Sequence, residues 1–151
     1  MLSCIDVAKY FLALTDEDAG DLISNLKLQK LLYYAQGFHL ALFDRPLFLD
    51  SIMAWTHGPV APSAYHFYKS YGSGPIPVPD DIDFDRYDIE TTELLDEVFR
   101  VFGQFSAWKL RNMTHAEPPW KDAAPTKGEI SHESLKRYFK TQLINDSANQ
   151  N

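Results

Sequence analysis

Five histidines and a single cysteine are the side chains of this 151-residue sequence most able to bind a metal ion or to act in catalysis. They are His39, His57, His66, His115, His132 and Cys4. The run His115-Ala116-Glu117 has the H-x-E spacing of zinc deaminases, whose second motif requires two cysteines. Neither that second motif nor H-E-x-x-H is present, so the sequence predicts no stoichiometric zinc, no metal site and no cofactor.

Motifs for nucleophilic or phosphate chemistry are missing as well. The sequence contains no G-x-S-x-G, no G-x-x-x-x-G-K-[ST] and no G-x-G-x-x-G. Cys4 shares a helical face with Val7 and Ala8, which predicts a buried and unreactive thiol. We therefore expect no catalytic residues and no enzyme. The alternative is a metal-dependent or hydrolytic enzyme that uses His57, His115 and Glu117, which only the fold could bring together.

Aromatic residues on rigid loops stand out more clearly than any catalytic set. Trp55 precedes His57-Gly58-Pro59, and Trp120 follows two prolines. An aromatic side chain on a rigid loop loses little entropy when it binds, so it is a good anchor for a partner. The competing interpretation is that each tryptophan fills the core at a corner of the chain.

Helical spacing dominates the elements that must position these loops. Helices are predicted from Ser3 to Leu14, from Asn25 to a break at 44–46, and over 62–71, 92–105, 106–113 and from Ser131 onward. Strands at 46–48 and 51–56 form one hairpin, and residues 72–88 and 114–120 are predicted loops. The fold class is therefore mainly α (α+β), with about six helices and one small β-hairpin. Residues 1–144 form one domain, and residues 145–151 form a polar, flexible tail.

The helix that begins near Asn25 has the strongest pattern. Its apolar stripe faces the core and comprises Leu28, Leu31, Leu32, Ala35, Phe38 and Leu42. Lys27, Lys30 and Tyr34 fall on another face, which we expect to be exposed. Gly37 lies in mid-helix, where glycine is unfavourable, and therefore predicts a close crossing by another element.

Charge is unevenly distributed along the chain. The net charge is −7, and the segment 80–97 holds nine acidic residues against Arg86, a sum of −8 that leaves +1 for the rest. We expect this segment to be a solvated loop that leads into a helix. The sequence shows no basic stripe of the kind that binds nucleic acid, no signal peptide and no apolar run of membrane-spanning length. A cytoplasmic location is the expectation that remains.

Three segments together resemble the SocA-like, or Panacea, antitoxin domain. They are residues 27–37, residues 54–62 with Tyr65, and Thr114-His115 with Pro119-Trp120, Ala123 and the later residues Ile130, Tyr138 and Phe139. The resemblance implies a non-enzymatic protein that binds and neutralises a cognate toxin protein. It also implies, for some members, a role as an adaptor that delivers the toxin to a AAA+ protease, and an association with phages. Many relatives add a helix-turn-helix domain, for which this chain has no room.

The expected partner-binding residues follow from this resemblance and from the exposed face predicted for the second helix. They are Lys27, Lys30, Tyr34, Trp55, His57, Gly58, Pro59, Tyr65, His115 and Trp120. The lysines would steer an acidic partner. The competing interpretation is that Lys30 and His57 only cap neighbouring backbone, and the acidic segment 80–97 is the second choice for the docking surface. No nucleic acid and no membrane partner is expected, and a homo-oligomer is left open.

Overall fold

The computed structural model describes residues 1–16 and 18–149, with side chains described as far as Leu143. Within that part of the chain there are seven α-helices and one two-stranded antiparallel sheet. The helices are α1 (Cys4–Ala13), α2 (Asn25–Phe43), α3 (Pro62–Phe67), α4 (Ile89–Phe102), α5 (Ala107–His115), α6 (Pro118–Ala123) and α7 (His132–Asn149). The strands are β1 (Met53–Trp55) and β2 (Gly58–Val60), and short 3-10 turns lie at Lys69–Tyr71, Phe84–Arg86 and Ala124–Thr126. The predicted mainly α fold with one small hairpin is confirmed.

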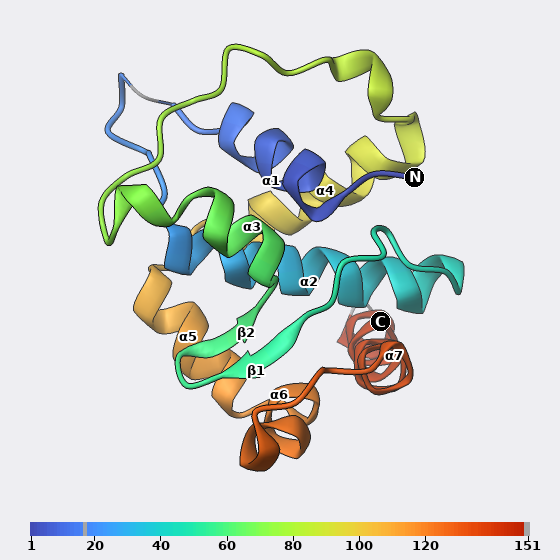
Figure 1. Ribbon diagram of the computed structural model, residues 1–151. Coiled ribbons are helices and arrows are strands. Elements are labelled where there is room, and N and C mark those ends of the chain that lie inside the picture. Colours follow the sequence, from blue (N-terminus) through green and yellow to red (C-terminus); the bar gives the residue numbers. More distant parts are fainter. Residues whose placement is uncertain (17, 150–151) are drawn as a thin grey trace.

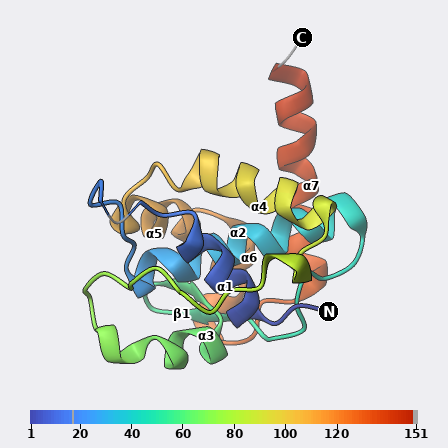
Figure 2. The same ribbon diagram turned by 90° about the horizontal axis from the view of Figure 1, so that it is seen from above.

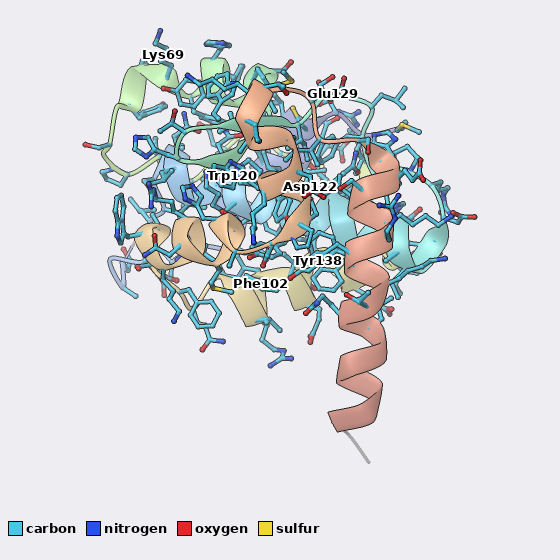
Figure 3. The ribbon with its side chains drawn as sticks, turned by 90° about the horizontal axis from the view of Figure 1, so that it is seen from below. Lys69, Phe102, Trp120, Asp122, Glu129 and Tyr138 are labelled. Carbon is cyan, nitrogen blue, oxygen red and sulfur yellow. The ribbon has the colours of Figure 1, made fainter. Side chains whose placement is uncertain are left out.

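Helix α2 runs through the middle of the molecule. In Figure 1, α1, α3 and α4 lie on one side of α2, while the hairpin, α5 and α6 lie on the other. Helix α7 crosses the C-terminal half of α2 and then projects beyond the rest of the domain (Figures 2 and 3). Because neighbours surround α2, fourteen of its nineteen residues are buried. A helix enclosed in this way must find partners for its polar side chains as well as for its apolar ones.

At Gly37, α7 approaches α2 so closely that a side chain would not fit. A Cβ atom at this position would lie 2.2 Å from two carbon atoms of the Phe139 ring. Phe139 itself is fully buried and packs edge to face against Tyr33. The predicted close crossing at Gly37 is confirmed, and α7 is the element that crosses.

Several helix ends lie where the local sequence predicts them, and others lie elsewhere. Ser3 and Asp6 exchange both hydrogen bonds of a capping box at the start of α1. The cap of α2 is Ser24, one residue before the predicted Asn25. The prediction of a loop over 114–120 was wrong, because α5 continues to His115 and α6 begins at Pro118. Proline is compatible with the first turn of a helix, where backbone N–H groups have no partner within the helix.

The hairpin lies later in the chain than predicted. Met53 pairs with Val60 and Trp55 with Gly58, so the turn is at 56–57. The predicted strand 51–56 contains β1, whereas the predicted strand 46–48 and its pairing were wrong. Gly58 has a φ of +112°, a conformation that glycine adopts readily and other residues rarely. The true hairpin therefore brings Trp55 and His57 to the end of a tight turn.

Side-chain amides of α2 hold the irregular segment that precedes the hairpin. Gln36 accepts hydrogen bonds from the backbone N–H groups of Leu47, at 2.8 Å, and Phe48, at 3.3 Å. Its amide nitrogen donates to the carbonyl of Phe48 at 2.7 Å. These bonds replace the strand pairing that the sequence predicted for 46–48.

A second set of amide bonds holds the chain that follows the hairpin. Gln29 accepts from the Ala61 backbone N–H at 2.9 Å and donates to the Asn25 side chain at 2.9 Å. Asn25 in turn donates to the Tyr65 carbonyl at 3.0 Å. The hairpin and α3 are thus fixed against the first half of α2 by buried hydrogen bonds.

The acidic segment 80–97 is mostly exposed, as predicted, and leads into α4 with Asp88 as the N-cap. Its charges pair with other parts of the surface, including Asp81 with Lys9 at 2.9 Å. The chain also forms no helix, among the residues that the structure describes, that is long and apolar enough to cross a membrane. Helix α7 covers 145–149 of the segment predicted as a tail, and residues 150 and 151 lie outside the described part.

Replacing Gly37 with Ala should destabilise the protein by about 1–3 kcal/mol, because the new methyl group overlaps the Phe139 ring. Chemical denaturation of Gly37→Ala, Phe139→Leu and the double variant measures this cost. In the Phe139→Leu background the cost of Gly37→Ala should fall, since the smaller side chain leaves space. An equal cost in both backgrounds would show that the crossing does not depend on this contact.

Candidate functional site

A cleft with a volume of about 750 Å³ lies between the first half of α2, the hairpin turn and the start of α5. We call it the hairpin cleft. The residues that characterise it are Leu26, Lys30, Trp55, His57, Tyr65 and Trp108. Trp55 packs edge to face against Tyr65, with ring centroids 5.2 Å apart. Trp108 stands at the start of α5 with 58% of its surface exposed. The cleft therefore combines a fixed aromatic wall with an exposed aromatic side chain.

Cationic and histidine side chains gather at this cleft. Lys30 is 0% exposed, and its Nζ donates to the Pro59 carbonyl at 3.2 Å. The Arg111 guanidinium lies over the Trp108 ring, 4.4 Å from its centroid, and its Nε donates to Nδ1 of His57 at 3.4 Å. Among the described residues that line the cleft, none is Asp or Glu.

The environment of Lys30 lowers its pKa to about 7, first through burial and then through the positive charge of Arg111. The Lys30 ammonium is packed against the hairpin, because a Cβ on Gly58 would come within 2.7 Å of its Cε. Lys30 thus bonds to nearby backbone, as the competing interpretation expected, and it also lines the hairpin cleft.

His115 and Trp120 hold the back of the hairpin. Their rings stack with centroids 3.9 Å apart, and the Trp120 indole N–H donates to the Trp55 carbonyl at 2.8 Å. Figure 3 shows Trp120 on α6, which lies next to α5. Burial lowers the pKa of His115, and the nearby charge of Arg111 lowers it further. Its Nε2 is buried with no hydrogen-bond partner in the described part of the chain.

Glu117 occupies a separate buried site that the sequence did not reveal. Its two carboxylate oxygens accept hydrogen bonds from the hydroxyls of Tyr33 and Tyr34, each at 2.9 Å, and Tyr138 of α7 donates to the same carboxylate. Burial raises the pKa of Glu117 to about 7, against the opposing effect of the three phenol donors. The group joins α2, the start of α6 and α7, and we call it the tyrosine–glutamate cluster.

The expectation that Lys30 and Tyr34 are exposed was wrong. Tyr34 is 1% exposed and stacks on Phe102 with centroids 3.9 Å apart, while Lys30 is covered by the hairpin. The polar face of α2 is buried because the hairpin and α6 supply acceptors for it, namely the Pro59 carbonyl and Glu117. Lys27 is only partly exposed and donates to the Gly103 carbonyl at 2.6 Å.

The structure brings some of the predicted residues together and separates others. Lys30, Trp55, His57 and Tyr65 line the hairpin cleft, and Gly58 and Pro59 are buried directly behind it. His115 and Trp120 support the hairpin, whereas Lys27 and Tyr34 bond elsewhere.

Sequence reasoning missed Trp108 and Arg111 as members of the site. Their i, i+3 spacing on the predicted helix places them on one face. Tryptophan is usually well buried, so a tryptophan exposed at the start of a helix is uncommon. That spacing was the available signal.

The residues considered for metal or hydrolytic chemistry lie in separate environments and have other contacts. In the described part of the chain, no group of three His, Cys, Asp or Glu side chains is placed to hold a metal ion. Both carboxylate oxygens of Glu117 are engaged by tyrosines, and His57 is exposed beside Arg111. The cysteine expected to be buried is buried, and desolvation raises the pKa of Cys4 to about 12.

Comparisons with known proteins identify the family to which this sequence belongs. The sequence model of the family described as "Antitoxin SocA-like, Panacea domain" matches residues 28–121, a range that contains the hairpin, α5 and the start of α6. The curated protein Antitoxin SocA of Caulobacter vibrioides (strain NA1000 / CB15N) is 35% identical over 109 residues, which are 65% of this chain and 58% of that protein. The match thus spans less than two thirds of the relative, and no solved structure matches the chain. The chain belongs to the SocA-like Panacea family.

The tyrosine–glutamate cluster predicts a measurable cost for Tyr33→Phe. Removing one donor from a buried carboxylate should lower the free energy of unfolding by about 1.5–3 kcal/mol at pH 8. The cost should shrink at pH 5, where Glu117 is protonated in the folded protein. Tyr65→Phe is the matched control, because the Tyr65 hydroxyl donates to none of the described residues. Equal effects of the two variants would contradict the proposed stabilisation.

Lys30→Met should change how stability depends on pH. The pKa of Lys30 is about 7 in the folded protein and about 10.4 when unfolded. Below pH 7 both states are protonated and the folded state carries the whole cost of the buried charge. That cost disappears as the pH rises through the window from 7 to 10.4. The charged or titratable groups that face Lys30 are Arg111, His57 and His115.

The measurement is the difference in unfolding free energy between Lys30→Met and the parent protein across this window. We expect the variant to be most favoured relative to the parent near pH 7, and to lose that advantage steadily towards pH 10. Lys69→Met, at an exposed position, should give a flat difference. A flat difference for Lys30→Met as well would mean that the Lys30 ammonium is not desolvated.

Proposed function

We propose that this chain, as a member of the SocA-like Panacea family, is an antitoxin that binds and neutralises a cognate protein toxin without turning over a substrate. The toxin would dock on the face that contains the hairpin cleft. Family membership and the printed name of the relative, Antitoxin SocA, support the antitoxin role. The family match over residues 28–121 contains both this face and the acidic segment 80–97, so the choice of face rests on the cleft itself.

The observation that carries the docking site is the exposed Trp108 beside a cleft with aromatic walls. Tryptophan, tyrosine and arginine dominate the binding energy of protein interfaces, and all three types meet here. The wall is rigid, since Trp55 is fixed by Tyr65 on one side and by the Trp120 bond on the other. A rigid anchor site loses little conformational entropy on binding.

Neutralisation could follow binding by two routes, and the proposal includes both. The antitoxin could block the toxin directly, or it could act as an adaptor that hands the toxin to a AAA+ protease. Both routes require the same first step, which is recognition of the toxin on this face.

Trp108→Ser should weaken toxin binding at least tenfold, because truncation of a central tryptophan at an interface commonly costs about 2 kcal/mol or more. The thermal midpoint should stay within a few degrees, since the side chain is largely exposed. We expect the cognate toxin to be encoded beside this gene. Titration calorimetry with that protein measures the affinity, and growth rescue on co-expression measures neutralisation.

Phe84→Ser is the matched control, because Phe84 is exposed to a similar extent, at 55%, and lies in the acidic segment 80–97. We expect this variant to bind and rescue like the parent protein. If Phe84→Ser fails and Trp108→Ser succeeds, the toxin docks on the acidic segment. If the parent protein neither binds nor rescues, the antitoxin proposal is wrong.

The two routes differ in the fate of the toxin. Adaptor activity predicts that the toxin half-life in cells falls at least severalfold when this protein is co-expressed, and recovers when the AAA+ protease is removed. Direct inhibition predicts an unchanged or longer half-life together with rescued growth. Measuring toxin abundance after translation is stopped separates them.

A further inference from the structure

The hairpin cleft has no acidic residue in its described lining, although the protein as a whole is negatively charged. The chain has 21 acidic residues and a net charge of −7, yet none of the described residues that line the cleft is acidic. Lys30 and Lys127 line it, and Arg111 contacts two further lining residues, His57 and Trp108. No ion pair within the described part of the chain involves Lys30 or Arg111.

These cations also have hydrogen-bond donors to spare. An ammonium group has three donors, and Lys30 gives one of them to the Pro59 carbonyl. A guanidinium has five, and Arg111 gives one to His57 and one to Asn112. Because Nδ1 of His57 accepts from Arg111, its Nε2 carries the proton in the neutral ring and can donate as well. Buried and half-buried donors without a counter-charge favour an anionic ligand.

The shape and surroundings of the cleft indicate which kind of anion it takes. A nucleic acid presents a line of phosphates and needs a basic track, whereas here the cations converge on one hollow of an acidic protein. The walls are apolar and aromatic, through Leu26, Trp55, Tyr65 and Trp108. A carboxylate side chain flanked by apolar side chains satisfies both features.

We propose that the hairpin cleft binds an Asp or Glu side chain of the partner protein, with the carboxylate against Arg111 and His57, near the positive charge of the buried Lys30, and a neighbouring apolar side chain against the aromatic wall. The identity of that partner as the toxin rests on the proposed function. The site itself is defined by this chain alone. The bound carboxylate supplies the counter-charge that the cations lack, so binding also favours the protonated state of Lys30.

All three tryptophans of the chain report on this cleft, which allows a direct test. Trp55 and Trp108 line it, and Trp120 is bonded to the Trp55 carbonyl. The probes are the peptides acetyl-Leu-Glu-Leu-amide and acetyl-Leu-Gln-Leu-amide, which differ only in the charged group. Their binding to the full chain is followed by tryptophan fluorescence and by the NMR shifts of the indole N–H groups.

We expect the Glu peptide to bind at least about tenfold more tightly than the Gln peptide, and to shift the indole signals of Trp55 and Trp108. In Arg111→Gln this preference should fall below about threefold. Arg137→Gln, which removes the same charge from the exposed surface of α7, should keep it. Equal binding of the two peptides, no response of the indoles, an unchanged preference in Arg111→Gln, or tighter binding of the dinucleotide pApA than of the Glu peptide would each overturn the proposal.

The toxin is tested separately, so the two proposals can fail independently. Arg111→Gln should weaken toxin binding at least about tenfold, and Arg137→Gln should change it less than twofold. A toxin that binds Arg111→Gln as well as it binds the parent protein overturns the carboxylate site and leaves the antitoxin function standing. A parent protein that prefers the Glu peptide but binds no toxin retains the site and loses the proposed function.

Discussion

The burial of α2 on all sides is the constraint on which the rest of the structure depends. A buried amide without a hydrogen-bond partner costs about 1–3 kcal/mol, so each polar side chain of this helix must be matched. Gln36 is matched by the backbone of 47–48, and Gln29 and Asn25 by the backbone around the end of the hairpin and α3. The segment between α2 and α3 forms a three-residue hairpin ladder and one bridge from Met53 to Glu129. Side chains of α2 supply further partners that a larger sheet would otherwise provide.

Local signals in the sequence predicted the parts of the fold that local chemistry decides. The start of α1 after Ser3 and the tight crossing at Gly37 follow from nearby residues, whereas α4 begins at Ile89, three residues before the predicted start at 92. The hairpin was misplaced because the backbone of 46–48 is bonded by a side chain distant in sequence, which no strand pattern can reveal. Helix α6 was missed because two prolines were taken to exclude a helix, whereas they stand in its first turn.

Of the residues expected to bind a partner, the structure gathers some into one cleft and buries others in the core. Trp55 and His57, beside the hairpin turn, line the cleft together with Tyr65 of α3. Lys30 and Tyr34 were assigned to the surface by a rule that places polar side chains of an amphipathic helix in water. That rule fails when other elements bring acceptors to the polar face. The acceptors here, the Pro59 carbonyl and Glu117, come from segments 29 and 83 residues away in the chain.

Two titratable groups of opposite sign lie at α2, Lys30 within the helix and the half-buried Glu117 beside it, and their surroundings differ. Three phenols from α2 and α7 donate to Glu117, so its carboxylate already has the partners that a buried anion needs. Lys30 has one carbonyl, cationic neighbours and a cleft in front of it. Among the described residues the two groups form no ion pair with each other. Burial disfavours both charges, and at Glu117 it outweighs the effect of the phenol donors on the pKa. The difference lies in the neighbours, because Glu117 already has hydrogen-bond donors from this chain, whereas Lys30 has a cationic neighbour, and an external carboxylate at the hairpin cleft would supply the missing counter-charge.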